Sequence, residues 1–171
     1  PKKHFDTLLY TTGSSNGTFT HTGVGFKPDL MWVKCRNAAE ANFFIDSVRG
    51  DQAVTNKFLR SNDEGGEGTA GTNGTTWTTI KGGFTVTETS IDNSNGGGEL
   101  YYSSRNYVAW CWKAGGSSNT FNIDDVGYAT VSAAGLDDGS INPTGASVNT
   151  ESGFSILTYT GTGSAATIGH G

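Results

Sequence analysis

Three histidines and two pairs of adjacent aspartates are the residues of this sequence whose chemistry could serve proton transfer. The histidines are far apart in the chain, and no GxSxG or HExxH motif accompanies them. Adjacent residues on a strand point to opposite faces, so neither aspartate pair places two carboxylates on one substrate. We expect both pairs to lie in solvated turns, and the sequence predicts no catalytic residue and no enzyme. These residues are His4, His21, His170, Asp124–Asp125 and Asp137–Asp138.

Two glycine-rich stretches have the spacing of ligand-binding motifs but lack the neighbouring residues that such motifs require. Gly66, Gly68 and Gly71 have GxGxxG spacing, but they follow no apolar strand and stand in an acidic loop that would repel phosphates. The stretch 92–99 resembles a calcium loop, yet Gly96 stands where an oxygen ligand is needed, and an irregular cation site stays open there as an alternative. The sequence therefore predicts no cofactor and no metal.

Aromatic residues beside these loops are the better candidates for binding. Exposed rings next to Asp and Asn are typical of lectin-like sugar sites, and the loops 62–74 and 91–99 carry such residues at their borders. The alternative is that the rings cover the edge of the core. The candidate glycan-binding residues are Trp77, Tyr101, Tyr102 and Asp92. Three other tryptophans, Trp32, Trp110 and Trp112, stand inside apolar strands, and we expect them in the core.

The composition indicates a β-rich fold. Glycine makes up 26 of 171 residues, about twice the usual share of about 7 %. Threonine favours strands, whereas glycine and asparagine favour turns and oppose helices. A formal net charge of −5 argues against a nucleic-acid partner. No apolar run approaches the roughly 18 residues of a membrane span, so no membrane insertion is expected.

Alternating apolar and polar residues locate the strands. Little in the sequence repeats with a helical period, so we expect an all-β fold, an antiparallel β-sandwich of jelly-roll or lectin-like type with little helix. Residues 14–17 read as a turn that joins the first two strands in a hairpin. The expected strands are 4–12, 18–22, 30–36, 42–48, 75–80, 82–88 and 107–116.

Cys35 and Cys111 each stand in an apolar strand-like run. Two cysteines form no disulfide framework, and no CxxC pair could hold zinc. We predict two buried thiols, and a cross-strand disulfide remains the alternative.

A sequence repetition suggests how the chain is divided. Phe154, Leu157, Tyr159 and His170 align without gaps with Phe5, Leu8, Tyr10 and His21. We therefore expect three segments. They are a β-sandwich domain at 1–116, a spacer or excursion rich in Gly, Ser, Asn and Asp at 117–152, and the first hairpin of a second, incomplete repeat at 153–171.

The segments "PDLMWVK" (28–34) and "YVAWCWKAGG" (107–116) are the most distinctive parts of the chain. With "FFIDSVRG" and "GGFTVTE" between them, the chain resembles a domain of unknown function found in tail-fibre and other virion structural proteins of marine bacteriophages, cyanophages especially. The resemblance covers 4–116 and resumes at 153–171. The acidic loop at 61–77 matches nothing in that pattern, and no catalytic residue can be carried over.

The resemblance implies a place in the virion, on the tail or capsid surface, rather than a mechanism. The expected function is that of a non-enzymatic structural protein of the phage exterior, a tail fibre or other component, with a contribution to host attachment. Its expected partners are copies of itself, other virion proteins and host surface glycans. The alternatives are a glycan-binding receptor-recognition module and a capsid decoration protein. A glycan-degrading enzyme would need two carboxylates about 5–9.5 Å apart in a cleft.

Overall fold

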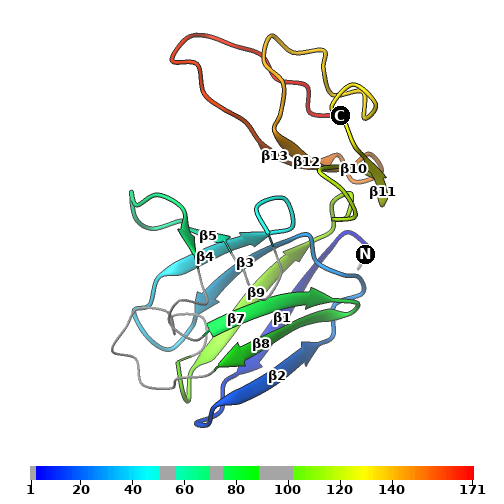
Figure 1. The fold of residues 1–171 in the computed structure, drawn as a ribbon. Coiled ribbons are helices and arrows are strands. Elements are labelled where there is room, and N and C mark those ends of the chain that lie inside the picture. Colours follow the sequence, from blue (N-terminus) through cyan, green and yellow to red (C-terminus); the bar gives the residue numbers. More distant parts are fainter. Residues whose placement is uncertain (1–2, 51–56, 70–74, 89–101) are drawn as a thin grey trace.

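The computed structural model describes residues 3–50, 57–69, 75–88 and 102–171. Within these ranges the chain forms thirteen strands in three sheets and no helix, which confirms the expected all-β class and is consistent with a β-sandwich (Figure 1). None of the described segments is therefore an apolar helix long enough to cross a membrane.

The largest sheet has six antiparallel strands in the order β1-β9-β3-β4-β5-β6. Apolar residues at every second position build it, because successive side chains of a strand point to opposite faces. The central strand β9 joins β1 on one side to β3 on the other. The strands are β1 (Phe5–Thr11), β3 (Leu30–Cys35), β4 (Asn42–Asp46), β5 (Lys57–Arg60), β6 (Gly68–Thr69) and β9 (Asn106–Trp112).

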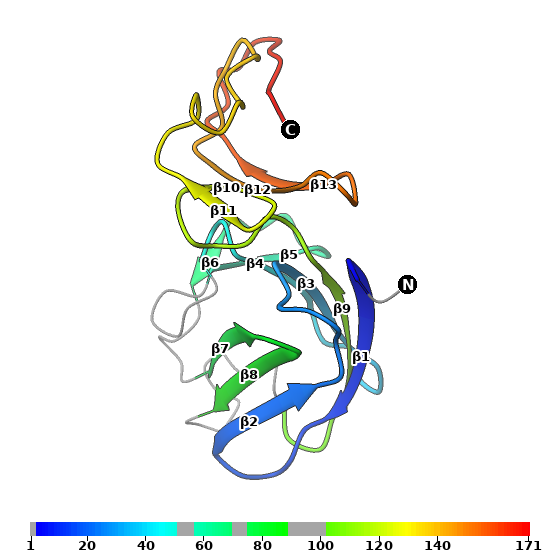
Figure 2. The ribbon, with the colours of Figure 1, turned by 90° about the vertical axis from the view of Figure 1, so that its right-hand side faces the viewer.

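A three-stranded sheet of β2 (Gly17–Thr22), β8 (Gly83–Glu88) and β7 (Thr75–Ile80) faces one side of the six-stranded sheet (Figure 2). The core lies between the two sheets. Aromatic and aliphatic side chains fill it, from Tyr10 on β1 to Trp77 on β7, and both cysteines belong to it as free thiols. The prediction of two buried thiols is thus confirmed.

β1 and β2 do not form the expected hairpin. β1 pairs with β9, about a hundred residues away in the chain, and β2 pairs with β8 in the opposite sheet. The turn at 14–17 therefore carries the chain from one layer of the sandwich to the other. The alternation in the sequence located both strands but held no information about their partners.

The segment expected as a spacer builds most of a third sheet, with the order β11-β10-β12-β13. Its strands are β10 (Phe121–Ile123), β11 (Val126–Tyr128), β12 (Gly145–Asn149) and β13 (Phe154–Thr158). β10 and β12 are parallel, and the other pairs are antiparallel. The description of 117–152 as a spacer or excursion did not include these strands, because β12 consists of small and polar residues that are nonetheless all buried.

Beyond β13, residues 159–171 form no strand and no hairpin. They are held by an isolated bridge between Ile141 and Ile168, and Ser155 Oγ on β13 donates a hydrogen bond to the His170 carbonyl at 2.7 Å. The second hairpin expected at 153–171 is therefore only half present as structure. The aspartate pair Asp124–Asp125 does occupy a turn, the two-residue connection of β10 and β11, where both residues have positive φ, as such tight hairpins require.

The third sheet sits on one end of the sandwich (Figures 1 and 2). Asp29, in the loop before β3, is buried and accepts hydrogen bonds at Oδ2 from the amides of Ala114 (2.7 Å) and Gly116 (3.3 Å). Gly115 donates its amide proton to Ser147 Oγ on β12 at 2.8 Å. The segment that follows β9 is thus held from both sides, which fixes the third sheet against the larger one.

Candidate functional site

The aromatic site expected around the glycine-rich loops is not assembled in the described structure. Trp77 is only 2 % exposed, because the alternation of β7 directs it into the core, where its ring contacts Phe58. A buried ring offers no face to a sugar, so its proposed binding role is corrected to a core role. Tyr102 is half-buried at the start of the turn into β9, and Tyr101 and Asp92 lie outside the described residues.

The other tryptophans are placed opposite to expectation. Trp32, Trp110 and Trp112 lie on the outer face of the six-stranded sheet, away from the sandwich core, and are half-buried there. The inner face of β9 carries Tyr107, Ala109 and Cys111 instead. Both faces of β3 and β9 are apolar, and the prediction that the three tryptophans face the core was wrong because the opposite face of each strand is the one that the second sheet covers.

Cross-strand register gathers the outer-face aromatics into rows. Trp32 on β3 lies opposite Trp110 on β9 and opposite Phe44 on β4, and Phe44 lies opposite Leu59 on β5. The ring centroids are 5.0 Å apart for Trp32 and Trp110 and 5.3 Å for Trp32 and Phe44. We call these four residues the aromatic row.

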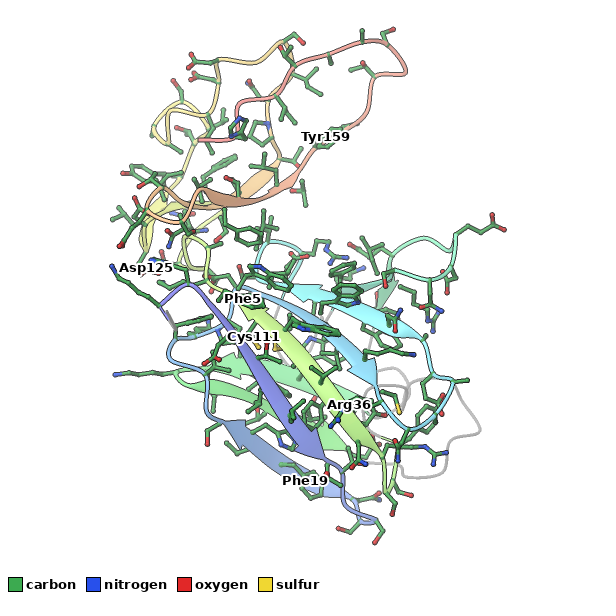
Figure 3. All side chains as sticks on the ribbon, turned by 180° about the vertical axis from the view of Figure 1, so that it is seen from behind. Phe5, Phe19, Arg36, Cys111, Asp125 and Tyr159 are labelled. Atoms are coloured by element: carbon green, nitrogen blue, oxygen red, sulfur yellow. The ribbon has the colours of Figure 1, made fainter. Side chains whose placement is uncertain are left out.

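A second pair of rings extends this apolar surface toward β1. Phe5 lies opposite Trp112, with ring centroids 5.0 Å apart, and is 43 % exposed; Figure 3 labels it near the boundary with the third sheet. Leu9, further along β1, is 59 % exposed. Side chains of this size pointing to solvent from one sheet face form an apolar patch of the kind that marks interaction sites.

Strand β13 lies beside the Phe44–Leu59 end of the aromatic row, and the two together form a groove. The groove has a volume of about 400 Å³, within the range of ligand sites. Its sheet side includes Phe44 and Leu59, and its other side is formed by β13 and the following Tyr159, which is 60 % exposed. Figure 3 labels Tyr159 in the third-sheet part of the molecule. Trp112 also contacts this strand, through Phe154, with ring centroids 6.2 Å apart.

A buried ion pair lines the same groove. Arg49 donates from Nε and Nη2 to Asp46 Oδ2, both at 2.5 Å, and from Nη2 to the Phe44 carbonyl at 3.2 Å. Asp46 Oδ1 accepts the amides of Val48 and Arg49. Both carboxylate oxygens of Asp46 are therefore engaged, and the groove combines an apolar floor with a charge-compensated polar end.

A second hollow, of about 320 Å³, is lined by charged groups at the junction of β1 and the third sheet. Lys113 binds Asp125 at 2.6 Å, and Lys3 binds Glu151 at 2.5 Å. Hydrogen bonds from Thr150 lower the pKa of Asp124, and the hydrogen bond from Lys3 lowers the pKa of Glu151. Asp125 and Glu151 thus form surface ion pairs, and Asp124 accepts hydrogen bonds from the amide and hydroxyl of Thr150.

Neither a cation site nor a histidine site emerges from the described ranges. Among residues 3–50, 57–69, 75–88 and 102–171, no group of three or more His, Cys, Asp or Glu side chains is placed to hold a metal. His21 packs against Tyr10 with ring centroids 4.3 Å apart, and burial lowers its pKa. The loop 91–99, where a cation site was left open, lies outside these residues.

One signal in the sequence could have identified the outer face. On β3 the Trp32 side also carries Lys34, whereas the other side carries Met31, Val33 and Cys35. A lysine on one face of a strand favours exposure of that face. The sequence holds no comparable indication of the groove, because β13 and β4, which line it, are more than a hundred residues apart in the chain.

The family comparison agrees with the sequence resemblance at a coarser level. The model of the family described as "Domain of unknown function (DUF7483)" matches residues 1–171, and the chain belongs to this family. No curated protein and no solved structure matches the chain.

Proposed function

We propose that this member of the DUF7483 family is a non-enzymatic structural protein of a bacteriophage exterior, a tail fibre or other surface component, which contributes to host attachment through the outer face of its six-stranded sheet. The observation that carries the proposal is the apolar surface on that face. It is built from the aromatic row and from Phe5, Leu9 and Trp112.

Such a surface costs free energy when it is left in water. Burial of apolar surface contributes about 25 cal/mol per Å², so several large side chains on one face favour contact with a partner. Interfaces are enriched in tryptophan and phenylalanine at their centres, and those residues are the ones gathered here.

The phage setting rests on the sequence resemblance. The segments that carry it most specifically, "PDLMWVK" and "YVAWCWKAGG", contain strands β3 and β9. These two strands supply Trp32, Trp110 and Trp112 to the outer face. The part of the sequence that resembles virion proteins is thus also the part that forms the proposed contact surface.

The location can be tested on purified virions of the phage that encodes the chain. Immunogold labelling with antibodies against the chain is expected to mark the tail or its fibres, together with recovery of its peptides from the particles by mass spectrometry. Label confined to the capsid would support the capsid decoration alternative. Absence of both label and peptides from the particles would contradict the proposal.

A further inference from the structure

We propose that the groove between strand β13 and the aromatic row is a binding site for an uncharged oligosaccharide, with Tyr159 and Phe44 as the contacting rings. This inference rests on the proposed attachment function and names the class of ligand that the outer face would take. The site differs from the loop residues that the sequence suggested.

The shape of the groove suits a chain of sugars. Leu59 and Phe44 line its sheet side, and beyond the groove the aromatic row continues across Trp32 to Trp110, so that the row spans four neighbouring strands. Three strand spacings of about 4.8 Å make this row about 14 Å long, which is the scale of a short oligosaccharide. β13 forms a wall along one side of the groove. A narrow ligand such as a sugar chain fits beside this wall, whereas a flat protein surface would contact β13 before it reached the floor.

The rings supply the apolar half of sugar recognition. The face of an aromatic ring is electron-rich, and the C–H groups on one side of a pyranose are polarised positively, so the two stack. Trp32 and Phe44 are nearly parallel, at an interplanar angle of 26°, and Tyr159 is the most exposed aromatic residue of the groove. Because Trp32 and Phe44 stack on each other, Tyr159 supplies the exposed ring face on which a sugar unit can stack, with Phe44 beside it in the groove.

The polar groups of the groove favour hydroxyls over charged groups. Asp46 compensates the charge of Arg49, so an anionic sugar would gain little from the guanidinium and would approach a carboxylate. Arg49 Nη1 has no hydrogen-bond acceptor, and the nearest carboxylate oxygen, Glu67 Oε2, is 4.0 Å away. This nitrogen is buried, and the Thr158 hydroxyl is already bonded to Thr144 Oγ1 and to the Gly145 carbonyl. The hydroxyl of the exposed Tyr159 is therefore the polar group of the groove that a sugar hydroxyl would meet and that a purely apolar ligand would leave unmatched.

The test uses the full chain and four defined probes. Maltohexaose, cellohexaose and a mannohexaose are neutral, and hexagalacturonate is the acidic comparison. We expect calorimetry to detect binding of at least one neutral hexasaccharide and none of hexagalacturonate. In ¹H–¹⁵N spectra, the indole signals of Trp32 and Trp110 are expected to shift, and the buried Trp77 indole is expected to stay unchanged.

Three variants separate the groove from the rest of the face. Tyr159→Ala is expected to weaken binding at least tenfold, whereas Tyr159→Phe, which keeps the ring, should stay within about threefold of the wild type. Leu9→Ala, on the same sheet face but outside the groove, should bind as the wild type does. Tyr159 and Leu9 are exposed, so these variants should all fold.

The inference is overturned if no neutral hexasaccharide binds at millimolar concentration, if hexagalacturonate binds better, or if Tyr159→Ala binds as the wild type does. It is also overturned if sedimentation shows a dimer that Leu59→Asp dissociates, since the groove would then be an interface between copies. These outcomes are independent of the virion labelling. If the particles are labelled but the chain binds no sugar, only the oligosaccharide site is contradicted. If the chain binds sugar but is absent from virions, only the proposed location is contradicted.

Discussion

Asp29 is the residue on which the connection between the two parts of the molecule depends most directly. Its carboxylate is buried and accepts two backbone amides from the segment after β9, and its own amide donates to the Trp112 carbonyl at 2.8 Å. Burial raises the pKa of this carboxyl above its ordinary value, and the two amide hydrogen bonds and Lys113 only partly oppose the shift. The native state therefore binds the Asp29 proton more tightly than the unfolded state does.

This shift predicts a pH dependence of stability. Between the ordinary pKa of about 4 and the raised folded value, the native state carries more proton than the unfolded state, so the free energy of unfolding decreases as pH rises. Asp29→Asn should remove this decrease, which urea denaturation from about pH 4 to about pH 7 would measure. Asp29→Ala should instead lower the free energy of unfolding by about 2–4 kcal/mol, because two amides lose their acceptor.

The control for this prediction is Asp137→Asn, since Asp137 is an exposed carboxylate. Its pH profile should match that of the wild type. A profile of Asp29→Asn that also matches the wild type would show that Asp29 is not the titrating group.

At the scale of elements, the connection from β9 to β10 passes close to the backbone of the third sheet. A Cβ atom on Gly115 would lie 2.4 Å from the Val148 carbonyl oxygen and 2.5 Å from that of Asn122. Both contacts are with backbone atoms of strands in the third sheet, so a side-chain rotation cannot relieve them. The glycine is required because two backbones meet at this point.

Gly115→Ala is therefore expected to destabilise the protein by about 2–3 kcal/mol, the usual cost of overpacking a close contact. Chemical denaturation would measure this loss. Gly161→Ala is the matched control, because an added Cβ there meets no atom within 4 Å. Equal stabilities of the two variants would show that the third sheet does not pack tightly against the β9–β10 connection.

At the scale of the whole molecule, the two hydrophobic clusters differ greatly in size. Among the residues that the structure describes, the sandwich core contains fourteen buried residues, whereas the cluster of the third sheet contains four: Phe121, Leu136, Ala146 and Val148. A small sheet with so little buried apolar surface is marginal on its own. Its order must come largely from packing on the end of the sandwich, through Asp29, Gly115 and Phe154.

Residues 117–171 expressed as a separate polypeptide are therefore expected to be unfolded, with a far-ultraviolet circular dichroism spectrum of a disordered chain. In the full chain, the amides of Ala146, Ser147 and Val148 should be protected from hydrogen exchange. A well-dispersed NMR spectrum of the isolated fragment would contradict this prediction and show that the third sheet is an independent unit.

The sequence by itself determined the all-β class and the places of most sandwich strands. Alternation over 30–35, 75–80 and 106–112 is a local property, and side chains two residues apart share a face whatever the rest of the chain does. Local pattern also predicted the buried thiols of Cys35 and Cys111.

Only the tertiary structure decided which apolar face the second sheet covers, and therefore which tryptophans are buried. A strand such as β9, with apolar side chains on both faces, does not reveal which face meets the second sheet, because that depends on strands far away in the sequence. The third sheet escaped prediction for a related reason: small residues such as those of β12 become buried only when another backbone approaches them. The candidate groove exists only because β13 returns to the outer face of β3 and β4, and no local rule of the chain encodes that meeting.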